Sequence, residues 1–238
     1  MSIITADSII KSYSMHAEND TPVLKGISLS IEKGAFIAFM GPSGAGKSTL
    51  LHILGLLDSP DGGKITYDLS GERCTHDAIN KQKSAALRNR HIGFIFQFHH
   101  LLPEFNALEN IMMPALIGGM SMSMARSKAL TLAEQVGMTH RCEHRPSELS
   151  GGEQQRIAIA RALMNDPDII IADEPTGNLD SANTIAVLQL IRSIRKERSL
   201  TLLIATHSMD VASMAERIIT LRDGVISSEV NTQSSVNQ

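Results

Sequence analysis

The sequence contains no tryptophan and few other aromatic residues, with two Tyr and six Phe among 238 residues. Proteins that bind single-stranded nucleic acids stack the bases on aromatic side chains, so this scarcity argues against such a function. A basic excess is missing as well: the formal net charge is −3, whereas proteins that bind nucleic acids through phosphate contacts usually carry an excess of Lys and Arg. We therefore expect no nucleic acid partner.

Cysteine is rare too, and Cys74 and Cys142 lie far apart in the sequence. Two distant cysteines do not form the disulfide framework of a small secreted protein, so free thiols in a reducing compartment are expected. The first residues lack the basic start and the apolar run of a signal peptide. No stretch approaches the length of about 18 apolar residues that a membrane-spanning helix needs, so we expect any membrane contact to go through a partner.

Apolar residues make up 42% of the chain, which is enough for a core at this length. The first third alternates apolar runs with turn signals and predicts strands over 27–31, 35–40 and 64–69, with a helix over 48–54. Helical spacing dominates the segment 107–164. The last third predicts buried parallel strands over 169–172 and 200–205, a helix over 181–197 and a hairpin over 217–226.

A glycine-rich loop separates the predicted strand 35–40 from the predicted helix 48–54. It fits the pattern G-x-x-x-x-G-K-[ST], and with the next residue it comprises Gly41, Pro42, Ser43, Gly44, Ala45, Gly46, Lys47, Ser48 and Thr49. Backbone N–H groups of such a loop curl around phosphate oxygens, and the positive end of the following helix faces the same phosphates. Lys47 would reach the β- and γ-phosphates, and the Ser48 hydroxyl would bind Mg²⁺. The loop alone fits a kinase, a GTPase or a transport ATPase.

Two carboxylates follow the apolar run 169–172, at the end of a strand predicted to be buried. Ligands of parallel sheets bind at the carboxyl ends of the strands. Asp173 would then belong to the Mg²⁺ shell, and Glu174 would polarise the attacking water as a general base. The alternative is an acidic pair at the start of a helix that Pro175 opens.

The segment from Leu149 to Arg156 reads LSGGEQQR. Ser150 and Glu153 have the spacing of a capping box, so a helix is predicted to begin here, and its positive end is a second anion site. Together with the two motifs on either side, this segment resembles the signature of ATP-binding-cassette (ABC) ATPases, and the resemblance covers essentially the whole chain.

The resemblance implies an α/β fold with a P-loop NTPase core, an antiparallel β subdomain and an inserted α-helical subdomain. We expect a single ABC ATPase domain over residues 1–226. Its core would comprise 1–97 and 166–226, its helical subdomain 98–165, and a polar, frayed tail would follow over 227–238.

The resemblance also implies a head-to-tail homodimer in which each ATP lies between the phosphate loop of one subunit and the signature of the other. Ser150, Gly151, Gly152 and Glu153 would then bind nucleotide, and Asp180 would act across the dimer interface. Tyr13 matches the aromatic residue that stacks on adenine, Gln97 the glutamine that serves catalysis and Mg²⁺, and His207 the switch histidine. The alternatives are an ordinary core or surface aromatic residue at Tyr13, a helix N-cap at Asp180 and a structural histidine at His207.

Glu153 departs from the family pattern, in which Gln is commoner. A carboxylate here would bring negative charge near the γ-phosphate unless it turns back towards the start of the helix. We therefore predict that Glu153 caps the helix, and that the Ser150 hydroxyl is shared between this cap and the phosphate.

The branch of the family is indicated by the window 94–110 and by residues 113–118. Both resemble most closely the ATPases of bacterial lipoprotein-releasing systems. This implies two integral membrane permease subunits as partners, lipoprotein cargo, and a peripheral location at the cytoplasmic side of the inner membrane. A cell-division ATPase that acts as a switch without transport, and a macrolide- or peptide-export ATPase, remain alternatives.

The same window holds four of the six phenylalanines. Phe94, Phe96 and Phe98 alternate as on a strand and are predicted to share one face, with Gln97 on the other. Phe105 is the predicted contact for a membrane partner. Half of the twelve methionines follow nearby, and they suit either a partner surface or the core of the helical segment: Met112, Met113, Met120, Met122, Met124 and Met138.

Overall fold

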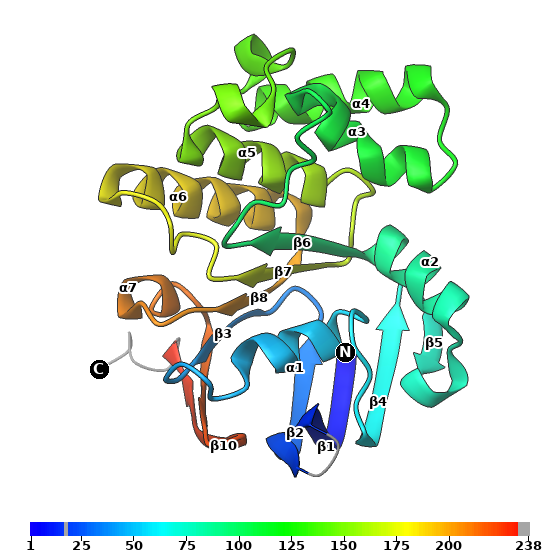
Figure 1. Ribbon diagram of the computed structural model, residues 1–238, viewed down its shortest axis with the longest axis vertical. Helices are drawn as coiled ribbons and strands as arrows, with labels where there is room; N and C mark the ends of the chain where they lie inside the picture. The colour runs from blue at the N-terminus through cyan, green and yellow to red at the C-terminus, as the bar shows by residue number, and fades with distance from the viewer. Residues whose placement is uncertain (17–18, 233–238) are drawn as a thin grey trace. The chain divides into compact units, whose positions relative to one another are not determined.

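The computed structural model describes residues 1–16 and 19–232. The chain divides into two units: residues 1–85 with residues 201 onward, and residues 86–200. Figure 1 follows the chain by colour from the N-terminus to the C-terminus.

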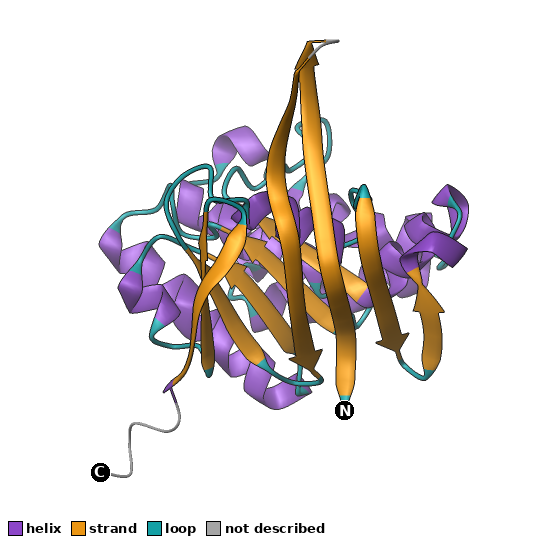
Figure 2. Cartoon of the chain, turned by 90° about the horizontal axis from the view of Figure 1, so that it is seen from below, coloured by secondary structure: helices purple, strands orange, loops and turns teal. Residues whose placement is uncertain are grey.

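The first unit begins with an antiparallel sheet whose strands lie in the order β2-β1-β4-β5. The strands are β1 (Ser2–His16), β2 (Asn19–Glu32), β4 (Gly62–Leu69) and β5 (Glu72–Thr75). Figure 2 shows β1 and β2 side by side along most of their length. The predicted run 27–31 is thus only the end of a much longer strand. The antiparallel β layer that the sequence predicted is confirmed.

The first unit also holds four strands in the order β10-β9-β3-β8, with β3 parallel to both of its neighbours. Their bounds are β3 (Phe36–Met40), β8 (Thr201–Ala205), β9 (Arg217–Arg222) and β10 (Val225–Asn231). Two helices accompany them, α1 (Lys47–Leu54) and α7 (Met209–Ala212), with a short turn η1 (His76–Ala78) after β5. Strand β3 reads FIAFM and strand β8 reads TLLIA, and these mainly apolar residues explain why both strands are buried.

The helix α2 (Lys81–His91) leads into the second unit, where β6 (Ile92–Phe96) pairs in parallel with β7 (Ile169–Asp173). The helices there are α3 (Ala107–Ile117), α4 (Met122–Gln135), α5 (Gly151–Ala162) and α6 (Ser181–Arg198), with short turns η2 (Thr139–Arg141) and η3 (Pro146–Glu148). Figure 1 shows α3, α4 and α5 gathered together, and α3 packs against both of the others. The predicted helical character of 107–164 is confirmed. The proposed boundaries of the helical subdomain stay a prediction.

The C-terminal region differs from the prediction of a frayed tail from Ser227. Strand β10 continues to Asn231, and its side chains are tied to β9: the Ser227 hydroxyl donates to the Thr220 carbonyl oxygen at 3.0 Å, and Arg217 Nε lies 2.6 Å from Glu229 Oε1. Polar residues form this strand because an edge strand has one solvated side. Residues 233–238 lie outside the described part.

The aromatic window is only partly as predicted. Phe94 and Phe96 share a face of β6, with ring centroids 5.6 Å apart and planes within 4°. Phe98 does not continue the alternation, because β6 ends at Phe96 and the chain turns; its side chain is 67% exposed. The prediction of three rings on one strand face is therefore wrong for Phe98.

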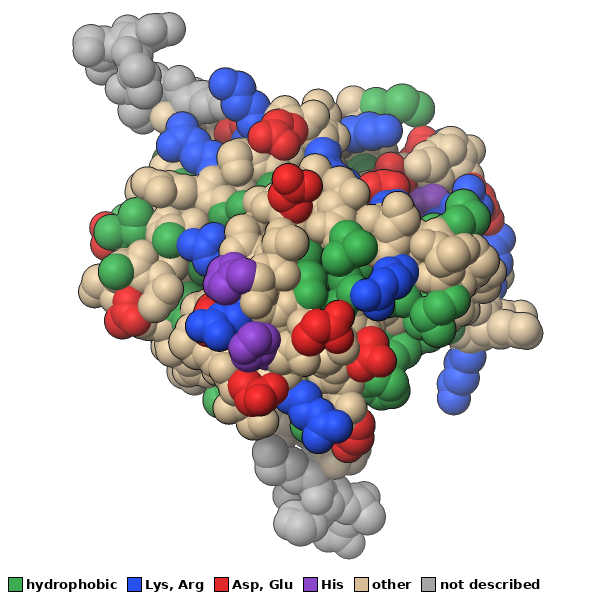
Figure 3. Space-filling view, turned by 90° about the horizontal axis from the view of Figure 1, so that it is seen from above, with side chains coloured by type: hydrophobic (Ala, Val, Ile, Leu, Met, Phe, Trp, Pro, Cys, Tyr) green, Lys and Arg blue, Asp and Glu red, His purple; other side chains and the backbone are tan. Residues whose placement is uncertain are grey.

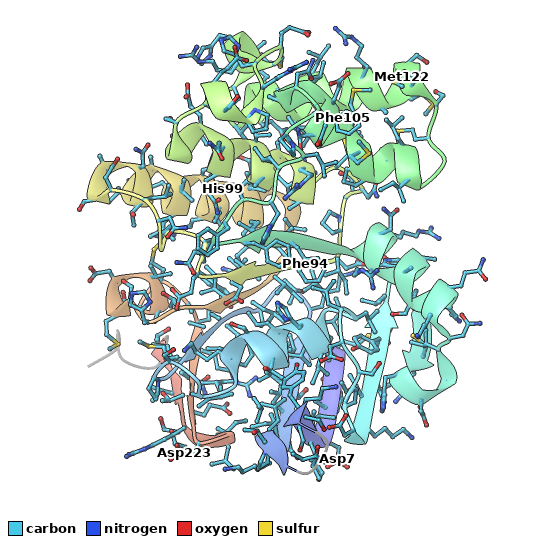
Figure 4. All side chains as sticks on the ribbon, in the orientation of Figure 1. Asp7, Phe94, His99, Phe105, Met122 and Asp223 are labelled. Carbon is cyan, nitrogen blue, oxygen red and sulfur yellow. The ribbon has the colours of Figure 1, made fainter. Side chains whose placement is uncertain are left out.

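The methionines divide between core and surface. Met112 and Met138 are buried, whereas Met122 and Met124 at the start of α4 are more than half exposed. Figure 4 labels Met122 there and Phe105 in the segment before α3. On the face seen in Figure 3, apolar side chains lie among acidic and basic ones. Within residues 1–16 and 19–232, no helix combines the length and apolar character that crossing a bilayer requires.

Candidate active site

The glycine-rich loop lies in the first unit, between β3 and α1, as predicted. Gly41 and Gly46 have φ values of 142° and 98°, in the region that favours glycine. Each also lies against a neighbour: a Cβ on Gly41 would be 2.1 Å from the Leu221 carbonyl oxygen, and one on Gly46 2.7 Å from Leu24 Cδ2. The sequence therefore needs glycine at both positions to fold the loop this way.

Lys47 and the start of α1 make this loop suitable for an anion. The Lys47 ammonium donates hydrogen bonds to the carbonyl oxygens of Gly41 at 2.8 Å and Pro42 at 3.0 Å, so its charge lies across the loop. No acidic residue occupies the first turn of α1, and the N-cap Gly46 supplies no side chain to its N–H groups. The positive end of the helix and Lys47 thus face the same loop.

His207 belongs to the same sheet edge of the first unit. It comes two residues after β8 ends, and β3 and β8 run in parallel with Phe39 opposite Ala205. The Thr206 backbone N–H donates to the Phe39 carbonyl oxygen at 3.0 Å, which holds this segment beside the residues that lead into the loop. The side chain of His207 is exposed.

Tyr13 lies near the end of β1, beyond the residues that pair with β4, and it is 41% exposed. It is not a core residue. Its hydroxyl donates to Asp58 Oδ2 at 2.8 Å, and the Lys11 ammonium lies 5.2 Å from its ring centroid. Lys11 is itself bonded to Asp58 Oδ1 at 3.1 Å. Burial and the Asp58 carboxylate raise the pKa of Tyr13, so the hydroxyl stays protonated and the ring is held in one place.

Asp58 and Lys11 were missed by the sequence reasoning, because residues 47 positions apart carry no local pattern. Burial alone would raise the pKa of Asp58. Hydrogen bonds from Tyr13, the Ser59 backbone and Lys11 outweigh burial, so the pKa of Asp58 is lowered overall. The resulting cluster of Lys11, Tyr13 and Asp58 holds the exposed tyrosine ring in place.

The acidic pair lies in the second unit. Asp173 is the last residue of β7, and Glu174 has φ of 47°, an uncommon value for a residue with a side chain. A turn follows, closed by the Gly177 N–H donating to the Glu174 carbonyl oxygen at 3.0 Å, and the next helix begins only at Ser181. The alternative of a helix opened by Pro175 is therefore wrong. Left-handed backbone at functional residues is a recurrent form of local strain.

Gln97 is brought beside this pair. Strands β6 and β7 pair with Phe96 opposite Asp173, so Gln97 is the first residue beyond that pair. Its Nε2 donates to Asn178 Oδ1 at 3.1 Å, and Asn178 Nδ2 donates back to the Gln97 carbonyl oxygen at 3.1 Å. A Cβ on Gly177 would lie 2.9 Å from Gln97 Nε2. The turn after Glu174 is thus built against Gln97.

The signature segment forms the start of α5, as predicted. Ser150 is the N-cap: its hydroxyl accepts from the Glu153 N–H at 3.3 Å, and its own N–H donates to Glu153 Oε2 at 2.8 Å. The prediction that Glu153 turns back into the cap is confirmed. Sequence reasoning missed Arg141, whose Nε lies 2.9 Å from Glu153 Oε1.

Asp180 is the N-cap of α6. It accepts hydrogen bonds from the Asn183 backbone N–H at 2.8 Å and from Asn183 Nδ2 at 2.7 Å, and the first of these is the largest cause of its lowered pKa. Asn183 also lies against the signature, because a Cβ on Gly152 would be 2.4 Å from Asn183 Oδ1. Capping thus accounts for Asp180, while a role across a dimer interface stays a prediction.

A phosphate-binding loop at the end of a parallel strand, together with an acidic pair at the end of another, defines the class of nucleotide-hydrolysing P-loop proteins. A family model described as ABC transporter matches residues 24–177. The chain therefore belongs to the ABC transporter family, and it is an ATPase of that family that binds ATP.

The relatives agree over nearly the whole chain. An ATP-binding protein LolD of a lipoprotein-releasing system, from Desulfotalea psychrophila, is 48% identical and covers 96% of this chain and 100% of its own length. A protein of the same name from Legionella pneumophila is 47% identical over 93% of this chain and 96% of its own.

A solved dimeric structure of an ATP-binding cassette, in a post-hydrolysis state with ADP and phosphate, superposes with a TM-score of 0.88 at 37% identity. It covers 96% of this chain and 98% of its own. The predicted ABC ATPase fold is thereby confirmed.

Proposed function

We propose that the chain is the ATP-hydrolysing subunit of a membrane complex that releases lipoproteins from the bacterial inner membrane towards the outer membrane. The observation that carries this proposal is the 48% identity, over 96% of this chain, to an ATP-binding protein of a lipoprotein-releasing system. The partners would be two integral membrane permease subunits, and the chain would be peripheral at the cytoplasmic side of the inner membrane. Lipoprotein cargo would meet the complex only through the permeases.

ATP would be held by the loop 41–49, with Tyr13 as the surface on which adenine stacks. The glycine backbone of the loop and the Lys47 ammonium favour the phosphates, and the exposed ring of Tyr13, bonded through its hydroxyl to Asp58, favours a nucleobase. Glu174 would take a proton from the attacking water, while Gln97 and His207 would orient that water and the γ-phosphate.

The three residues that the sequence predicts as Mg²⁺ ligands have side chains that suit this ion. Ser48, Gln97 and Asp173 offer a hydroxyl, an amide and a carboxylate oxygen, which are the donors that this hard cation takes. When bound, Mg²⁺ would neutralise part of the charge on the phosphates.

A homodimer would complete the site. The dimeric cassette with ADP and phosphate supports this arrangement for the family fold. The segment 150–153 opens a helix with its positive end exposed to an anion, and one nucleotide has no need for two helix N-termini of the same chain. We propose that this segment binds the ATP held by the other copy, with Asp180 beside it.

Two experiments test the proposal. Affinity purification of the chain from membranes should recover two integral membrane subunits of the lipoprotein-releasing type. Recovery of a cell-division partner instead would contradict lipoprotein release and leave ATP hydrolysis untouched.

The mechanism is tested separately with Glu174→Gln. Loss of a general base typically lowers the rate by about 10²–10⁴-fold, so the variant should bind ATP and accumulate as a dimer with little hydrolysis. Size-exclusion chromatography with ATP and with ADP measures this directly. A chain that stays monomeric in saturating ATP would contradict the dimer.

A further inference from the structure

Both oxygens of the Glu153 carboxylate are engaged at the start of α5. Glu153 Oε2 accepts the Ser150 N–H at 2.8 Å, and Glu153 Oε1 lies 2.9 Å from Arg141 Nε. The side chains of Arg141 and Glu153 are 36% and 23% exposed, so the pair is only partly solvated. One oxygen thus closes the helix cap, and the other is neutralised by a guanidinium.

Arg141 is presented by a segment with its own backbone hydrogen bonds. Arg141 is the last residue of the turn η2. Its N–H donates to the Met138 carbonyl oxygen at 3.0 Å, and its carbonyl oxygen accepts the His144 N–H at 3.0 Å. Cys142 and Met138 beside it are buried. Arg141 Nη1 also lies 3.1 Å from His144 Nε2. The guanidinium is therefore fixed from two sides while it faces Glu153.

This geometry answers the problem that Glu153 creates. A carboxylate in the first turn stabilises a helix, but it also cancels the positive end that attracts an anion. The Arg141 guanidinium compensates the negative charge of Glu153 at the N-terminus of α5, and its hydrogen bond holds the carboxylate in the cap. Without Arg141, an uncompensated carboxylate would lie three residues from Ser150, where the proposed function needs a phosphate to bind.

We propose that Arg141 is a positioning residue of the signature: it neutralises and orients Glu153 so that the start of α5 accepts the γ-phosphate of ATP held by a second copy. The inference rests on the proposed dimer. Arg141 touches no nucleotide in this scheme and acts only through Glu153. If the pair of Arg141 and Glu153 were an ordinary surface ion pair, removing Arg141 would change the properties of the protein little. The test must distinguish this outcome from a positioning role.

The test uses the full-length chain with Glu174→Gln, in which ATP-driven dimers accumulate. Arg141→Leu should raise the ATP concentration for half-maximal dimer formation by about tenfold, the ratio that corresponds to losing one charge-assisted contact. Adding Glu153→Gln to Arg141→Leu should restore dimer formation to within about twofold, because the uncompensated charge is then gone. Glu153→Gln alone is the reference with which the double variant is compared.

Controls separate positioning from folding. Arg126→Leu removes a guanidinium from a more exposed pair with Glu143, whose charged atoms are 3.7 Å apart, and should leave dimer formation unchanged. Thermal unfolding and ATP binding by the monomer are measured for every variant. If Arg141→Leu fails to fold, Arg141→Lys keeps the charge and should give an intermediate ATP requirement.

The outcomes are distinguishable. An unchanged ATP requirement in Arg141→Leu, or a defect that Glu153→Gln does not relieve, overturns the role of Arg141 and leaves the proposed function intact. If the chain with Glu174→Gln alone stays monomeric in ATP, the proposed dimer fails, and the role of Arg141 fails with it.

Discussion

Gln155 of α5 donates a hydrogen bond of 2.7 Å from its Nε2 to the carbonyl oxygen of Pro175, the residue directly after Glu174. Gln155 is fully buried, and its Oε1 has no hydrogen-bond partner among the described residues. The unsatisfied oxygen costs stability, and the hydrogen bond to Pro175 offsets part of that cost. It links the helix of the signature to the left-handed turn that presents Glu174, the proposed general base.

Gln155→Leu should therefore separate activity from stability. The substitution removes one unsatisfied oxygen but leaves the buried Pro175 carbonyl oxygen without its donor, so the free energy of unfolding should fall by about 1–3 kcal/mol at most. The turn at Glu174 loses its tether, and the turnover number should fall roughly ten- to a hundredfold with KM for ATP unchanged. Steady-state ATPase assays and thermal unfolding check both parts. A rise in KM without loss of turnover would contradict a link to Glu174.

Asp58 should act on nucleotide affinity through Tyr13. Asp58→Ala removes the hydrogen bond that the Tyr13 hydroxyl donates and loosens the ring, so KM for ATP should rise about fivefold, part of the 1–3 kcal/mol that base stacking contributes. The turnover number at saturating ATP should not change, because the phosphates are held elsewhere.

Asp61→Ala is the matched control for Asp58→Ala. Asp61 also bonds Lys11, at 3.4 Å, and the Ser12 backbone N–H at 2.6 Å, but it makes no hydrogen bond with Tyr13 among those found. Equal effects of the two substitutions on KM would show that Lys11, not the tyrosine hydroxyl, matters.

The sequence predicts those parts of the site that short-range geometry fixes. The spacing of Ser150 and Glu153 is enough for a capping box, since both bonds close within one helical turn. The same holds for the strand-loop-helix unit predicted over 35–54 and for the apolar run 169–172, which is typical of a buried parallel strand.

The missed features depend on tertiary contact. Arg141 reaches Glu153 from an irregular segment that has no periodic pattern, and the bonds between Gln97 and Asn178 join residues 81 positions apart. The positive φ of Glu174 also has no sequence signal, because glycine is the residue that would mark it. Alternation alone predicts a strand position for Phe98, although the strand ends two residues earlier.

Gly46 is predicted to be irreplaceable for nucleotide binding. Gly46→Ala places a Cβ at positive φ and 2.7 Å from Leu24 Cδ2, so the loop must shift, and ATP binding should be lost. The left-handed backbone alone costs a non-glycine residue roughly 1–2 kcal/mol.

Gly71→Ala is the control for backbone strain. Gly71 has φ of 86° and no atom within 4 Å of an added Cβ, so the substitution carries the strain without the clash. It should lower the free energy of unfolding by a similar backbone cost and leave ATP binding intact, as measured by equilibrium unfolding and nucleotide titration. Retained ATP binding by Gly46→Ala would contradict the loop geometry.

The pair at the start of α5 also predicts a pH dependence of stability. The Ser150 backbone N–H, followed by the Ser150 side chain and Arg141, lowers the pKa of Glu153 below its ordinary value of 4.5. A carboxyl group with a lower pKa in the folded than in the unfolded state stabilises the fold when ionised, so its contribution is complete well above pH 4.5 and is lost as the pH falls through the lowered pKa. Glu153→Gln should thus be less stable than the parent chain at neutral pH, and the difference should shrink in acid. Glu104→Gln, at an exposed position, should parallel the parent at each pH. Urea unfolding from pH 7 down to about pH 3 measures the difference, and a gap that stays constant over this range would contradict the ionised cap.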